Sequence, residues 1–210
     1  MPGLAASSSI FEKIDLPKDI FEVHLLDWIL PLEKEALKSY AERLSQQVTH
    51  KNAVLIGVSF GGIIVQEMAQ FLSPTKVIII SSVKCKAELS MKMKLAKMTR
   101  AYKLMPTSLL SDMNQLEKYL KRAIPQQRIN YYKKYLTITD KNYLDWAIEQ
   151  VVAWDRLSPD KKVIHIHGDR DTVFPSQNIH DFINVKGGTH VMILNRSKWF
   201  NENLPRIILE

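Results

Sequence analysis

A serine stands between glycines in the segment Gly57-Val58-Ser59-Phe60-Gly61-Gly62, directly after a short apolar run. The G-x-S-x-G spacing is typical of a tight turn from a strand into a helix, which holds a serine hydroxyl clear of the sheet. The first N–H groups of a helix lack partners, so the Phe60 amide is a candidate donor to a developing oxyanion. We therefore predict that Ser59 is a nucleophile; the alternative is a glycine-rich turn with an incidental serine.

A serine hydroxyl attacks well only when a base removes its proton, and that base needs an acid to orient it. His190 is the candidate base, because Gly187 and Gly188 let its loop fold back over a sheet edge. Asp169 and Asp171 are both candidate acids, because they follow an apolar run that ends at the same edge. The ordinary alternatives are an exposed loop histidine and turn-forming aspartates.

Apolar runs separated by helical patterns indicate the elements that position these residues. Continuous apolar runs suit strands buried on both faces, so we predict an α/β fold with a mostly parallel sheet flanked by helices. The helices are expected near 32–49, directly after Ser59, and through Trp199 and Phe200. The expected strands are 21–25, 53–57, 76–80, 163–167 and 182–185.

The strand pattern is interrupted between residues 84 and 154, where helical segments are broken by Pro106 and Pro125. We predict a core formed by 1–83 and 155–210, with 84–154 inserted as a helical cap over the carboxyl edge of the sheet. Methionines gather in this stretch and suit either a pliable apolar lid or ordinary core packing. They are Met91, Met93, Met98 and Met105.

Composition limits the classes of partner. The 210 residues are 46% hydrophobic, which suits one globular domain, and the formal charge is +7. The basic excess between Lys84 and Arg100 is not interleaved with aromatic residues, so we expect a solvated face rather than a nucleic-acid site. Apolar runs such as 77–80 are too short for stable membrane insertion. The single cysteine, Cys85, and an N-terminus unlike a signal peptide predict a cytoplasmic protein.

No cluster of histidine and cysteine has the spacing of metal ligands. His165 and His167 alternate along a predicted strand and point the same way, but no third ligand lies near them in the sequence. We therefore predict no metal and no cofactor. The expected partner is a small-molecule acyl substrate, and the sequence leaves the oligomeric state open.

These motifs together resemble the α/β-hydrolase superfamily, in particular its small, lid-bearing esterase-like members. Serine, aspartate and histidine occur in that family's order along the chain. The family's acid stands three residues after the glycine of His167-Gly168-Asp169-Arg170-Asp171, which selects Asp171. The resemblance also implies a second oxyanion donor on an early loop, here the backbone N–H of Leu4, with Pro2 in place of the usual histidine.

One departure from the family concerns a strand. The family has a buried strand before the Leu4 loop, between the strands equivalent to 21–25 and 53–57, and this sequence has none. Because neighbouring strands lie about 4.8 Å apart, the loss would leave a gap of about 10 Å. We expect that the natural protein starts further upstream and that Met1 is a truncated or misassigned start.

The predicted activity is hydrolysis of a carboxylic ester by Ser59, His190 and Asp171 through an acyl-enzyme. The same residues could instead act on thioesters, amides or activated carbon–carbon bonds, or transfer the acyl group to another acceptor. A third possibility is a ligand-binding relative without catalysis.

Overall fold

A computed structural model describes residues 1–104, 107, 117 and 126–210. A four-stranded parallel sheet with the order β1-β2-β3-β4 forms its centre. Ser59 follows β1, and Asp171 and His190 follow β3 and β4, so all three lie at the carboxyl edge of the sheet. The strands are β1 (Val54–Val58), β2 (Lys76–Ile80), β3 (Val163–Gly168) and β4 (Ile183–Val185).

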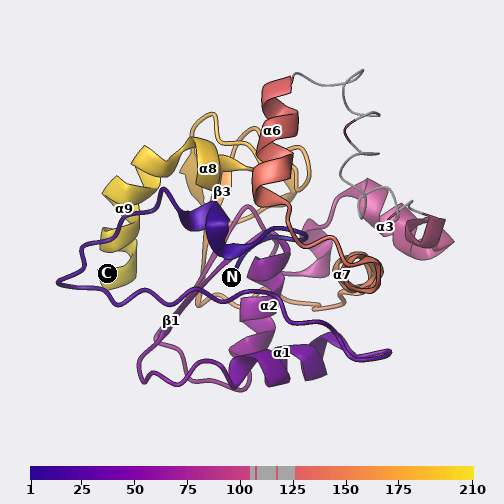
Figure 1. The fold of residues 1–210 in the computed structure, drawn as a ribbon, viewed down its shortest axis with the longest axis horizontal. Coiled ribbons are helices and arrows are strands. Elements are labelled where there is room, and N and C mark those ends of the chain that lie inside the picture. The colour runs from indigo at the N-terminus through magenta and orange to yellow at the C-terminus, as the bar shows by residue number, and fades with distance from the viewer. Residues whose placement is uncertain (105–106, 108–116, 118–125) are drawn as a thin grey trace.

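The two faces of the sheet bury separate apolar clusters. Along β2, Val77 and Ile79 belong to one cluster, whereas Ile78 and Ile80 belong to the other. This alternation follows from the two-residue period of a strand. One face packs against α1, α2 and α7, and the other against α8 and α9, so helices cover both faces (Figure 1).

The helices mostly follow the predicted pattern, with adjusted ends. α1 is shorter than the predicted helix 32–49, and two helices have side-chain caps. Asp140 accepts a hydrogen bond from the Tyr143 amide at the start of α7, and Ser90 accepts one from the Met93 amide at the start of α3. The helices are α1 (Leu37–Ser45), α2 (Phe60–Met68), α3 (Met91–Thr99), α6 (Gln126–Tyr135), α7 (Lys141–Ala153), α8 (Met192–Asn195) and α9 (Ser197–Leu209).

Short 3₁₀ helices also occur among the described residues. None of the helices in the described residues is long and apolar enough to cross a membrane. The 3₁₀ helices are η1 (Ser8–Phe11), η2 (Lys86–Glu88), η3 (Ala101–Leu104) and η4 (Ser176–Asn178).

The prediction of a strand at 21–25 is wrong. This segment has no regular secondary structure and joins no sheet, and Val23 and Leu25 are 59% and 56% exposed. An apolar run becomes a strand only beside another strand that accepts its backbone hydrogen bonds. Within the described residues, the outer edge of β1 is hydrogen-bonded to Met1, whose nitrogen donates to Ile56 O and whose carbonyl accepts from the Val58 amide.

Helices α3, α6 and α7 lie between β2 and β3 along the chain. These helices differ in how deeply they are buried. Tyr143 and Leu144 of α7 are buried in the apolar cluster that contains Val77 and Ile79, whereas Met91 and Met98 of α3 are 74% and 78% exposed. Met93 packs partly against the core. Of the residues named above in this stretch, Met105, Pro106 and Pro125 lie outside the described residues.

Candidate active site

Ser59 occupies the sharp turn between β1 and α2, with φ of 54° and ψ of −120°. A residue with a side chain rarely adopts positive φ, so the surrounding structure must hold this strained conformation. Hydrogen bonds act on both sides of the residue. The Ser59 amide donates to Ile80 O at 2.9 Å, and the Ser82 hydroxyl donates to Ser59 O at 2.7 Å.

The glycines on either side of Ser59 are needed because main-chain atoms approach them closely. A Cβ on Gly57 would lie 2.2 Å from Gly61 O, and a Cβ on Gly61 would lie 2.3 Å from Pro2 O. Both distances are far below van der Waals contact. The turn therefore excludes larger residues at these two positions, and the segment beginning at Met1 lies directly against it.

The structure brings three predicted site residues into one hydrogen-bonded chain. His190 Nε2 lies 2.9 Å from Ser59 Oγ, and His190 Nδ1 lies 2.9 Å from Asp171 Oδ2. An ionised carboxylate only accepts hydrogen bonds, so Nδ1 carries the proton of a neutral imidazole. Nε2 then presents its lone pair to the Ser59 hydroxyl. Phe174 packs against the imidazole edge to face, with ring centroids 5.5 Å apart.

Asp171 is buried and held as a carboxylate by its hydrogen-bond donors. Its Oδ1 accepts from the amides of Val173 and Phe174, and its Oδ2 faces His190. Burial by itself would raise the pKa of Asp171, but the hydrogen bond from His190, the electrostatic attraction between the two groups and the Phe174 amide hold the pKa below its ordinary value. The carboxylate can therefore orient His190 and stabilise its protonated form.

Asp169, the other candidate acid, has a different position. It is exposed, and its Oδ1 accepts a hydrogen bond from the Gly187 amide at 2.7 Å. The Arg170 amide donates to Gly188 O, so the two loops are joined twice. Asp169 thus fastens the loop that carries His190, a contact that its position in the sequence alone does not reveal.

The histidine pair on β3 lies buried near Asp171. His165 Nε2 is 3.1 Å from His167 Nδ1, and His167 Nε2 is 2.8 Å from Phe174 O. Burial lowers the pKa of both histidines, well below the ordinary value for His165, so both are neutral near pH 7. A neutral His167 that donates to Phe174 O must accept from His165. The pair supports the loop that surrounds Asp171.

Two backbone amides that could bind an oxyanion border Ser59. Phe60 begins α2, and Leu4 lies in a tight turn in which the Ala6 amide donates to Gly3 O. Within the described part of the chain, neither the Phe60 nor the Leu4 amide has a hydrogen-bond acceptor. A Cβ on Gly3 would lie 3.9 Å from Ser59 Oγ, which places the turn beside the hydroxyl.

Trp28 connects the two segments that carry these amides. Its indole Nε1 donates to Gly3 O at 3.0 Å, and its ring stacks on Phe60 with centroids 5.1 Å apart. Trp28 therefore packs against both the early turn and the residue after Ser59. No sequence motif indicated this role, because the contact depends on the path of an irregular segment.

The fold matches solved structures over nearly the whole chain. No protein-family profile matches the sequence, and no curated protein matches it. A protein described as a non-heme bromoperoxidase from Mycobacterium tuberculosis is 14% identical with a TM-score of 0.71, covering 100% of this chain and 90% of that one. A marine microorganism esterase is 18% identical with a TM-score of 0.67, covering 98% and 92%. An esterase from Exiguobacterium antarcticum is 15% identical with a TM-score of 0.62, covering 100% and 92%. The chain has the α/β-hydrolase fold.

Proposed function

We propose that the protein is a serine hydrolase that cleaves a carboxylic ester, or a related acyl bond, of a small and partly apolar substrate. The observation that carries this proposal is the continuous hydrogen-bonded chain from Ser59 through His190 to the buried Asp171. Esterases among the structures of similar fold are consistent with it.

In the proposed reaction, His190 Nε2 takes the proton of Ser59 as Oγ attacks the substrate carbonyl carbon. Asp171 stabilises the imidazolium that forms, and His190 then protonates the departing alkoxide. A water molecule, deprotonated by His190, attacks the acyl-enzyme and releases the carboxylic acid. Ser59 recovers its proton, so the residues return to their initial state.

The oxyanion of each tetrahedral intermediate would be bound by the Phe60 and Leu4 amides. These donors suit that role because both border Ser59 and neither has another acceptor within the described residues. Fixed backbone dipoles stabilise charge that develops in the transition state more than charge present in the substrate. They would therefore raise kcat rather than only tighten substrate binding.

We assign residues 84–154 to a cap beside this site. Among the described residues of this segment, α7 packs against the residues beside the site: its Tyr143 and Trp146 rings lie 5.3 Å from Trp28 and 5.9 Å from Phe60. Tyr143, Trp146 and Phe60 are buried, so α7 would support the wall of an acyl site rather than contact the acyl group itself. The cap would thus influence which acyl chains are accepted.

The proposal is tested with p-nitrophenyl esters of increasing acyl length, from acetate to decanoate, using wild type and Ser59→Ala. We expect turnover by wild type, with a preference for one range of lengths. Ser59→Ala should lose activity by at least about 10³-fold. Equal turnover by both proteins would contradict the proposal.

A competing alcohol in the same assay reports the fate of the acyl group. Hydrolysis predicts that the free carboxylic acid remains the main product when alcohol is added. A predominance of the new ester would identify an acyltransferase with the same residues. Stoichiometric binding of the esters without turnover by folded wild type would instead favour a non-catalytic ligand-binding protein.

A further inference from the structure

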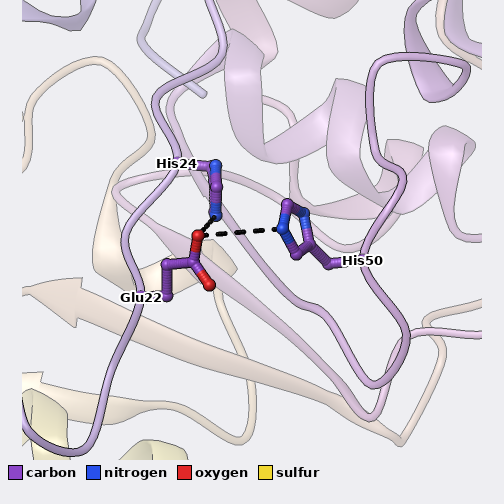
Figure 2. A group of neighbouring side chains, drawn as sticks. All are labelled: Glu22, His24 and His50. Atoms are coloured by element: carbon purple, nitrogen blue, oxygen red, sulfur yellow. Dashed lines mark ion pairs between the residues drawn. The ribbon is translucent and has the colours of Figure 1, made fainter.

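Three side chains with metal-binding atoms meet near the amino end of β1. Glu22 and His24 lie on the extended segment before α1, and His50 lies on the loop between α1 and β1 (Figure 2). Ser59 follows the other end of the same strand, so this group is separate from the candidate active site. Among the described residues, it is the one group of three or more histidine, cysteine or carboxylate side chains that lie close enough to hold one ion.

The distances between these atoms suit one shared ion. Glu22 Oε1 lies 2.9 Å from His24 Nε2 and 3.8 Å from His50 Nε2, and one potential ligand atom from each residue lies within 4.8 Å of the others. Zinc bonds to nitrogen and oxygen of about 2.0–2.1 Å put tetrahedral ligand atoms about 3.3 Å apart. The observed separations lie on either side of this value, so small side-chain rotations would complete the geometry.

The positions of the three residues also suit a shared metal ion. The side chains of Glu22 and His24 both point toward His50 (Figure 2). The two imidazole rings have centroids 4.1 Å apart; because a ring nitrogen binds an ion in the plane of its ring, the rings would turn slightly apart to share one. His24 and His50 are each about half exposed, which leaves room for water as a fourth ligand.

We propose that Glu22, His24 and His50 bind a divalent transition-metal ion, with Zn²⁺ as the preferred candidate. Two imidazoles and one carboxylate form a donor set that suits zinc better than magnesium or calcium, which prefer oxygen ligands. The proposal does not depend on the hydrolase activity. It departs from the expectation of no metal, because 25 residues separate His24 from His50 in the sequence and no local spacing reveals the group.

The ion would fasten a segment that the sheet does not hold. Residues 21–25 join no strand, and exposed apolar side chains such as Val23 and Leu25 contribute little packing there. An exposed ion pair between Glu22 and His24 adds little stability. A bound metal would tie this segment to the loop before β1 and stabilise the folded state.

The test is titration of ZnCl₂ into chelator-treated, tag-free protein in a calorimeter. We expect one zinc per chain, with at least a tenfold loss of affinity in His24→Gln and in His50→Gln. His180→Gln is the matched control, because His180 is also exposed and lies outside the group. His190→Gln is the second control, because His190 is partly exposed and lies in the candidate active site, where zinc could also bind; both controls should bind as wild type does.

Thermal unfolding gives an independent readout. At a free zinc concentration about ten times Kd, the Tm of wild type should rise by roughly 3–6 °C, and the Tm of His50→Gln should not. His24→Gln, His50→Gln and His180→Gln should have the wild-type Tm without zinc, since these side chains are exposed. Absence of binding by wild type, or binding that His190→Gln abolishes and His50→Gln retains, would overturn the proposal.

Discussion

The backbone of Ser59 adopts a conformation that its own side chain disfavours, and neighbouring residues hold it there. Its amide is hydrogen-bonded to the last residue of β2 and its carbonyl to Ser82, two residues further on, and glycines on each side permit the close main-chain contacts. The hydroxyl therefore has a fixed direction before substrate arrives. Such preorganisation places the reacting oxygen next to His190 without further ordering.

Asp171→Asn should retain the fold and lose most of the activity. The amide could still face His190, but it favours the wrong imidazole tautomer and cannot stabilise the imidazolium. We expect kcat for the best ester to fall by about 10³–10⁴-fold with a small change in KM. Asp169→Asn is the control. Asp169 binds a loop amide and does not contact His190, so this substitution should lower kcat much less. Similar losses in the two variants would contradict the assignment of Asp171.

Gly61→Ala should damage both stability and catalysis. Its new Cβ would lie 2.3 Å from Pro2 O and 2.6 Å from Met1 O, so the early segment must move away. Overpacking of this kind costs about 1–3 kcal/mol, which urea unfolding would measure. The displaced segment carries the Leu4 amide, so kcat should also fall by at least about tenfold. Wild-type kcat in the folded variant would argue against this role for the segment.

At the scale of elements, the predictions of strands and helices succeeded where the residue pattern alone determines the structure, without contacts from distant parts of the chain. The strand at Lys76–Ile80 is found as predicted, because its apolar run Val77–Ile80 favours a strand buried on both faces. The prediction of a strand at 21–25 failed because a strand needs a neighbouring strand to pair with, and the residue pattern does not show whether one is present. Ser59, Asp171 and His190 were predictable because each follows a strand at the same edge, whereas Trp28 and His50 make contacts with residues distant in the sequence.

Trp28→Phe tests whether an irregular segment positions the active site. Phenylalanine keeps an aromatic ring against Phe60 but removes the hydrogen bond to Gly3 O. A lost hydrogen bond of about 1 kcal/mol corresponds to roughly a fivefold decrease in kcat, and KM should change little. Trp199→Phe on α9 is the matched control and should leave kcat unchanged. A decrease in stability with unchanged kcat would show that Trp28 acts only in packing.

At the scale of the whole molecule, two neutral histidines inside the sheet link folding to pH. The pKa values of His165 and His167 are lowered in the folded state, so the unfolded chain binds more protons below about pH 6.5. Their contribution to stability is complete above that pH and is lost as pH falls through the folded-state values. The protein should therefore become less stable on acidification from pH 7 to pH 5.

His165→Gln isolates this contribution. Glutamine can still donate to His167 but does not titrate, so the urea midpoint of the variant should depend less on pH between 7 and 5 than that of wild type. Comparing slopes removes any constant effect of the substitution on stability. Parallel pH profiles for the two proteins would contradict the neutral state of His165.

The central claim is that Ser59 is an activated nucleophile, and reaction with a fluorophosphonate tests it most directly. Intact mass spectrometry of wild type and Ser59→Ala, each shown to be folded, would count the covalent adducts. We predict one adduct on wild type and none on Ser59→Ala. Labelling of both proteins, or of neither, would contradict the account.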